Sequence, residues 1–147
     1  MKYDDYLLKV LNNKCPFCDL DNDYIVERWK HFTVILARAP YTKDHLLIVP
    51  NRHLIRMWEI KLEERWTLVP LIEKWAKKLE KIHKEVNVLL RDWVANGVIW
   101  KSIDHLHIHL IPDHPVYSST GWMRREVFSD YQLIKKTLEF KDKVEWK

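Results

Sequence analysis

The chain is poor in glycine and cysteine, and it has no long apolar segment. Its 147 residues include two glycines and two cysteines. No stretch approaches the roughly 18 uninterrupted apolar residues of a membrane-spanning helix. The N-terminal sequence Met1–Asp5 also lacks the basic region and the apolar run of a secretory signal peptide. These absences predict a cytoplasmic protein with no membrane partner.

Two cysteines are too few for a disulfide framework, but their spacing is informative. Cys15 and Cys18 form a Cys-x-x-Cys motif, which in a reducing compartment is used more often for metal binding or redox chemistry than for a structural disulfide. Two thiolates fill only half of a tetrahedral zinc site. The motif alone therefore leaves zinc binding, a redox pair and two idle thiols open.

The charge is modest and evenly mixed. The net charge is +4 and the isoelectric point is about 9.0, which favours anionic partners. Basic and acidic residues alternate along 61–85, as on a solvated helix face, and no long basic arm occurs. The charge permits nucleic-acid binding without indicating it, and we do not expect a nucleic-acid partner.

The size and the hydrophobic periodicity predict a single domain, residues 1–147, of mixed secondary structure. A hydrophobic content of 47% is enough for one substantial core. Pro70 interrupts the longest amphipathic stripe, which predicts either a kinked helix or two helices. Ser129 and Gln132 have capping-box spacing ahead of a C-terminal helix. The predicted elements are helices over 4–12 and 61–86 and strands over 24–28, 31–38, 46–49, 87–93 and 103–111, with a turn at Asn96-Gly97.

The most informative feature is the segment from His105 to His109, in which histidine alternates with apolar residues. A period of two predicts a strand with three imidazoles on one face and a core-facing apolar side. A single histidine there would be an ordinary polar face. Three in register favour function, because neutral imidazole is both a nucleophile and a metal ligand at pH 7.

This segment, with Ser102 before it and Pro112 after it, resembles the signature of the histidine triad (HIT) superfamily of nucleotidyl hydrolases and transferases. The stretch 40–53, which contains His45 and His53, resembles a second motif of the same family. The resemblance covers about 15–115 and leaves a C-terminal extension over 116–147. It implies an α+β fold with an antiparallel sheet of about five strands, one long helix and shorter terminal helices, commonly in a homodimer.

The resemblance also implies roles for individual residues. His107 is the nucleophile that attacks the α-phosphorus of a nucleotide and forms a covalent intermediate. His109 and Ser102 contact the phosphate, and His45 lies near the leaving group, although it could instead be a solvent-facing residue at a strand start. Lys101 either brings a positive charge to a polyphosphate or is an ordinary surface lysine.

Zinc-containing members of the superfamily complete a Cys-x-x-Cys site with two histidines, which here are His53 and His105. Together with Cys15 and Cys18 they give four ligands. Four protein ligands leave no open position for water, so the resemblance implies a structural Zn²⁺ ion.

Three positions depart from the family pattern. Ala37 replaces the Asp or Asn that bonds the ribose, Asp44 replaces the glycine before His45, and Trp100 replaces another glycine. We expect the last two to add bulk and charge at the pocket mouth. The nucleoside, including whether its base is adenine, stays open. Trp29, Trp93 and Trp100 are candidates for stacking on a base, although tryptophan is mainly core material.

The leading hypothesis is a hydrolase or nucleotidyltransferase that cleaves a phosphoramidate, a phosphoanhydride or a dinucleoside polyphosphate. The departures at Ala37, Asp44 and Trp100 motivate an alternative, a zinc-stabilised module that binds a nucleotide without turnover. The basic isoelectric point and the eight tryptophans motivate a third, a nucleic-acid end-processing deadenylase.

Overall fold

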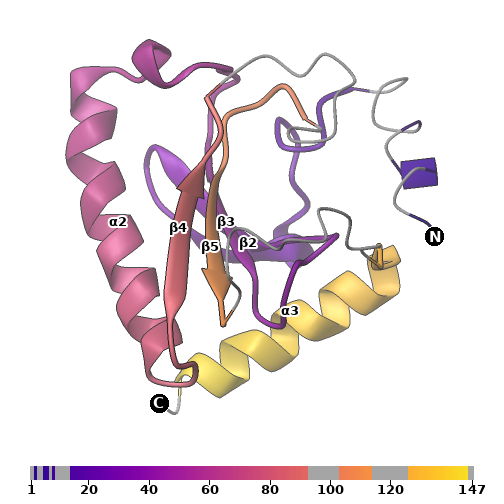
Figure 1. The fold of residues 1–147 in the computed structure, drawn as a ribbon. Coiled ribbons are helices and arrows are strands. Elements are labelled where there is room, and N and C mark those ends of the chain that lie inside the picture. Colours follow the sequence, from indigo (N-terminus) through magenta and orange to yellow (C-terminus); the bar gives the residue numbers. More distant parts are fainter. Residues whose placement is uncertain are drawn as a thin grey trace, which may run out of the picture.

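The computed structural model describes residues 14–92, 103–113 and 126–145, together with positions 2, 5, 6 and 8 (Figure 1). The predicted N-terminal helix lies mostly outside the described residues. The Asn96-Gly97 turn and Trp93, Trp100, Lys101 and Ser102 lie outside them altogether. The elements are η1 (Asn22–Tyr24), β1 (Ile25–Arg28), β2 (Phe32–Leu36), β3 (Leu46–Pro50), η2 (Met57–Glu59), α2 (Leu62–Glu80), β4 (Val86–Leu90), β5 (Ile108–Pro112) and α3 (Asp130–Glu145).

The strands form one antiparallel sheet in the order β1-β2-β3-β5-β4. His109 is paired with Leu47 on β3 and with Leu89 on β4, so it lies in the interior of the sheet. The prediction of an α+β fold with five antiparallel strands is confirmed.

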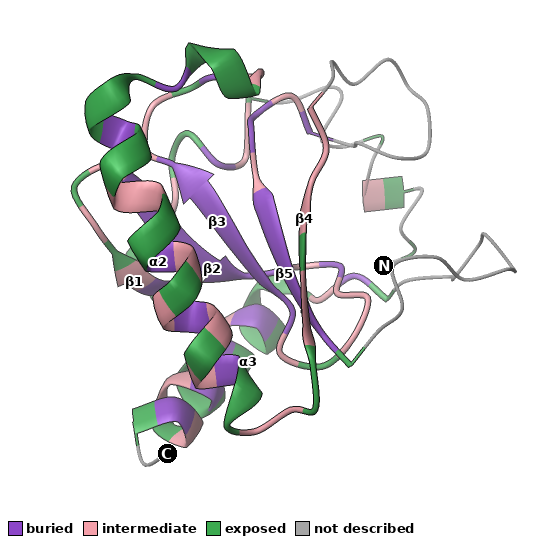
Figure 2. Ribbon diagram, turned by 60° about the vertical axis from the view of Figure 1, so that its left-hand side comes forward, coloured by how far each residue is buried: buried purple, intermediate pink, exposed green. Residues whose placement is uncertain are grey.

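The strands β2, β3 and β5 are buried on both faces. On one face, Val34, Ile48 and Leu110 join a core with residues of both long helices (Figure 2). The opposite face carries Ile35, Leu47 and a smaller cluster that includes Phe17 and Ile103. Because side chains alternate along a strand, His109 lies on this second face with its partner Leu47.

The long helix differs from its prediction at its C-terminal end. α2 continues through Pro70 as one helix but stops at Glu80, and Val86 begins β4 instead of ending the helix. The turn between them is held by His83, whose ring nitrogens lie 2.7 Å from carboxylate oxygens of Asp44 and Asp113. These long-range contacts are invisible to helical periodicity.

The C-terminal extension contributes to the core through α3. The predicted capping box is confirmed, because the Ser129 amide donates to Gln132 Oε1 at 2.9 Å and the Gln132 amide donates to Ser129 Oγ at 3.2 Å. Leu133, Phe140 and Val144 are buried in the main cluster. Residues 130–145 are therefore part of the packed structure.

Exposed apolar side chains gather around η2 and the first turns of α2, namely Met57, Trp58, Leu62, Trp66 and Val69. The homodimer that the resemblance implies stays a prediction. None of the helices in the described part of the chain is long and apolar enough to cross a membrane.

The N-terminus of α2 supplies an acid-sensitive contribution to stability. Glu64 accepts hydrogen bonds from the Lys61 amide at 2.8 Å and from Arg52 Nε at 2.6 Å. The Arg52 contact is the main cause that lowers the pKa of Glu64 below 4.5. A carboxylate with a lowered folded-state pKa stabilises the fold above its unfolded-state pKa and loses that contribution as the pH falls through the folded-state value.

We therefore expect Glu64→Gln to lower the free energy of unfolding by about 1–2 kcal/mol at pH 7. The difference in the free energy of unfolding between the variant and the wild type should shrink on acidification from pH 5 to pH 3. Urea denaturation at these pH values measures it, with the exposed Glu63→Gln as the matched control. A pH-independent difference would contradict the role of the charge.

Candidate functional site

The histidine segment is not one continuous strand. β5 begins at Ile108, so the prediction of a strand from Ile103, with His105 and His107 in it, is wrong. The Leu106 amide donates to the Leu54 carbonyl at 2.7 Å, a contact outside the sheet ladder. The three imidazoles consequently do not form a single row: His105 is fully buried beside the cysteines, whereas His107 and His109 line a pocket.

Backbone carbonyls fix the tautomers of two of these histidines. A carbonyl oxygen only accepts, so His105 Nε2 donates to the Pro50 carbonyl at 2.8 Å and leaves the lone pair on Nδ1. That Nδ1 faces Cys15 Sγ at 3.4 Å. His107 Nδ1 donates to the His105 carbonyl at 2.7 Å, which leaves the lone pair of His107 on Nε2. His105 thus presents a lone pair on Nδ1 that can bind a metal, and His107 presents one on Nε2 that can act as a nucleophile.

A backbone amide fixes the tautomers of the other pair. The Tyr41 N–H donates to His45 Nδ1 at 3.1 Å, so His45 carries its proton on Nε2. This Nε2 lies 2.9 Å from His109 Nδ1 and donates to it. His109 therefore carries its proton on Nε2. Both rings are neutral in this arrangement, which agrees with their burial, because they are only 1% and 5% exposed.

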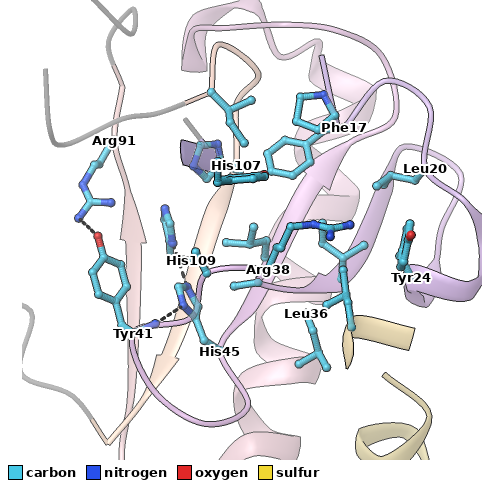
Figure 3. Close-up of a pocket in the computed structure, with 18 of the residues that line it drawn as sticks. Phe17, Leu20, Tyr24, Leu36, Arg38, Tyr41, His45, Arg91, His107 and His109 are labelled. Atoms are coloured by element: carbon cyan, nitrogen blue, oxygen red, sulfur yellow. Dashed lines mark hydrogen bonds between the residues drawn. The ribbon is translucent and has the colours of Figure 1, made fainter. Parts of the chain in front are cut away.

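The pocket contains three of the four predicted catalytic residues, His45, His107 and His109 (Figure 3). The rings of His107 and His109 lie 4.9 Å apart between their centroids. The fourth predicted residue, Ser102, and the predicted phosphate ligand Lys101 lie outside the described residues. An imidazole nucleophile next to a second imidazole that donates a proton is an arrangement suited to displacement at phosphorus.

Several pocket residues were missed by the sequence interpretation. Phe17 packs edge-on against His107 with ring centroids 5.5 Å apart, and Tyr41 stacks on His45 at 5.5 Å. Arg91 and the exposed Asp19 also line the pocket. Phe17 lies inside the Cys-x-x-Cys motif, and Tyr41 lies inside the stretch 40–53 that resembles a family motif. Both positions could therefore have been suggested by the sequence. Nothing in the sequence marks Arg91 or Asp19.

The departures from the family pattern have different consequences. Ala37 lines the pocket and is 4% exposed, so the pocket lacks a carboxylate at this position. Asp44 does not line this pocket, contrary to expectation. It has a positive φ of 64° and pairs with His83 and Lys143, so its charge is compensated outside this pocket. Trp29 packs against the main core and also lies outside the pocket.

The four predicted zinc ligands come together. Cys15, Cys18, His53 and His105 offer donor atoms that lie within 4.8 Å of one another, and Cys18 Sγ is 3.1 Å from His53 Nδ1. Desolvation of its sulfur, followed by the hydrogen bond and the charge of Cys15, raises the pKa of Cys18 from 9.0 to about 11. The thiolate form of Cys18 is thus disfavoured without a cation beside it. The donor set of two sulfurs and two imidazole nitrogens fits tetrahedral Zn²⁺.

The chain is similar in sequence or structure to several known proteins. Over 75 residues the chain is 33% identical to the adenosine 5'-monophosphoramidase of Schizosaccharomyces pombe, and the match spans 50% of this chain and 52% of that protein. A structure of the Plasmodium falciparum diadenosine triphosphate hydrolase in complex with cyclomarin A superimposes with a TM-score of 0.69 at 14% identity, covering 97% of this chain and 96% of that one.

A Zn-bound histidine triad family protein from Mycobacterium smegmatis superimposes with a TM-score of 0.55 at 14% identity, covering 95% and 96% of the two chains. At these identities the two structures show the fold alone. The profile of the HIT domain matches residues 21–116, which is more than half of the chain. The chain belongs to the HIT domain family.

Proposed function

We propose that the protein is a nucleotide hydrolase or nucleotidyltransferase that breaks a bond to the α-phosphorus through a covalent nucleotidyl-His107 intermediate. The observation that carries this proposal is the 2.7 Å bond from His107 Nδ1 to the His105 carbonyl. It holds the lone pair on Nε2, the atom that must attack. The roles of the other pocket residues then follow from the hydrogen bonds that each side chain can donate or accept.

In the first step His107 Nε2 forms a bond to phosphorus as the bond to the leaving group breaks and its electron pair departs with that group. His109 Nε2–H donates to a phosphate oxygen, and the bond from His45 holds His109 in the required tautomer. In the second step water or another acceptor attacks phosphorus, and the electron pair of the P–N bond returns to His107. Ser102 and Lys101 are proposed to add a hydroxyl donor and a positive charge.

The pocket walls support a nucleoside on one side of the histidines. Phe17, Leu20 and Ile35 give an apolar surface on which a base can pack. The name of the S. pombe relative supports adenosine as the nucleoside and a phosphoramidate as one substrate. The absence of a carboxylate at Ala37 argues that the ribose contact is made differently in this chain, and Asp19 is a carboxylate on the same pocket.

We also propose a structural Zn²⁺ ion held by Cys15, Cys18, His53 and His105, in a chain that is one domain over 1–147. The Cys/His geometry supports the ion, and the core residues of α3 support the domain. When bound, the ion would tie the segment before β1 to the residues that lead into β5. Because all four ligands come from the protein, the ion supplies no activated water.

The function is tested by incubating the purified protein with adenosine 5'-monophosphoramidate and with diadenosine triphosphate in ¹⁸O-water. We expect release of AMP that carries one ¹⁸O atom, detected by mass spectrometry. Binding of AMP by calorimetry without turnover of either substrate would contradict the proposal and favour a nucleotide-binding module. Processing of adenylated DNA in preference to both small substrates would favour the deadenylase.

A further inference from the structure

The pocket carries a cation on the side of the histidines opposite its apolar wall. In Figure 3, His107 and His109 lie between Leu20 on one side and Tyr41 with Arg91 on the other. A nucleotide whose base packs on the apolar wall and whose α-phosphorus faces His107 therefore directs its remaining substituent toward Arg91.

The guanidinium of Arg91 is held in place but keeps donors for a ligand. Its Nη2 lies 3.4 Å from the Tyr41 hydroxyl, and its central carbon lies 5.9 Å from the centre of the Tyr41 ring. Within the described part of the chain no carboxylate pairs with it, and its neighbour Asp92 is engaged by Arg56 at 3.4 Å. A guanidinium has five N–H donors, so most remain for an anion.

Arg38, the other arginine among the described residues that line the pocket, is not available in this way. Arg38 Nη1 donates to Asp130 Oδ1 at 2.7 Å and to the Phe128 carbonyl at 3.1 Å, and both contacts fix the start of α3. Its charge is compensated on the apolar side of the pocket. Among the described residues of the pocket, Arg91 is therefore the arginine that a substrate anion can use.

Arg91 is also connected to two of the predicted catalytic histidines. The Tyr41 ring that it contacts stacks on His45 at 5.5 Å, and the Tyr41 amide bonds His45 Nδ1. His45 in turn bonds His109. Tyr41 thus connects Arg91 to the His45–His109 pair.

We propose that Arg91 is a specificity-determining residue that binds the phosphate next to the α-phosphate, so that this site favours phosphoanhydride substrates over phosphoramidates. The inference rests on the proposed function of His107. When His107 Nε2 bonds to phosphorus in an anhydride, the P–O bond breaks, its electron pair stays on the bridging oxygen, and the leaving phosphate gains a negative charge. Arg91 stabilises that charge. In a phosphoramidate the P–N bond breaks, its electron pair stays on nitrogen, and the nitrogen takes a proton from solvent, so a neutral amine leaves and Arg91 has no new negative charge to stabilise.

Kinetics on two substrates test this proposal. We expect Arg91→Gln to lower kcat/KM for diadenosine triphosphate by about 10- to 100-fold, the range of a charge-assisted hydrogen bond, and that for adenosine 5'-monophosphoramidate by less than about 3-fold. Arg91→Lys should keep most of the wild-type kcat/KM for diadenosine triphosphate, because it keeps the positive charge. The exposed Arg65→Gln on α2 is the matched control and should change neither value.

If Arg91→Gln lowered kcat/KM equally for the two substrates, or did not lower it for diadenosine triphosphate, the role of Arg91 would be overturned. The proposed function would be left intact. A wild type that turns over neither substrate would refute the proposed function instead. In that case calorimetry with AMP and ATP, without divalent cations, still tests Arg91. The wild type should bind ATP more tightly than AMP, and Arg91→Gln should lose at least about 10-fold of that preference. An unchanged preference would overturn the proposal.

Discussion

Replacing His107 with glycine is expected to reduce kcat/KM by about 10⁴-fold or more, because the variant lacks the atom that forms the covalent bond. The fold should be preserved, since the half-buried His107 side chain lines the pocket and belongs to none of the buried apolar clusters of the described residues. Steady-state kinetics measures the loss, and the thermal midpoint verifies the fold. His31→Ala, which removes a histidine from outside the pocket, should leave kcat/KM unchanged.

Two further measurements test His107, and the second separates a nucleophile from a general base. Free imidazole should restore part of the activity of His107→Gly, because the deleted ring leaves a space of its own shape beside Phe17. The stereochemistry at a chiral phosphorus should show net retention, because two in-line displacements each invert the centre. Net inversion in the wild type would mean that water attacks directly, and it would refute the covalent intermediate.

The sequence contained enough to predict which residues gather, but not how each ring is held. The resemblance to zinc-containing histidine triad proteins implied a cluster of Cys15, Cys18, His53 and His105, and their donor atoms do lie together. The tautomer of His105, however, depends on the Pro50 carbonyl, which is distant along the chain. Such a bond exists only after β3 and the histidine segment have been brought together, so periodicity cannot reveal it.

The errors share the same physical origin. Alternation from His105 to His109 predicted a longer strand, but the bond from the Leu106 amide to Leu54 removes this part of the backbone from the sheet ladder. Asp44 looked like an added charge at the pocket mouth, yet its φ of 64° and its pairing with His83 turn it away. In both cases a contact between distant segments overrides a local pattern.

The second large effect is expected at the Cys/His cluster. Purified protein should contain one zinc per chain, and removal of the metal by a chelator should lower the thermal midpoint by about 10 °C, which corresponds to a few kcal/mol for a chain of this size. The double variant Cys15→Ser/Cys18→Ser should purify without zinc and melt at the lower temperature with or without chelator. His31→Ala should keep one zinc, because His31 is not part of the cluster.

Proton release gives an independent readout of the same site. The pKa of Cys18 is raised to about 11, so this thiol is protonated at pH 7 until a cation displaces the proton. Zinc binding should therefore release protons into a weakly buffered solution, and zinc affinity should fall as the pH falls. Full-length protein that is folded and metal-free as purified, with a thermal midpoint that neither zinc nor chelator changes, would contradict the zinc site. Such a result would leave the proposed chemistry of His107 untouched. The lone pair is held on His107 Nε2 by the hydrogen bond from Nδ1 to the His105 carbonyl, and not by the Cys/His cluster.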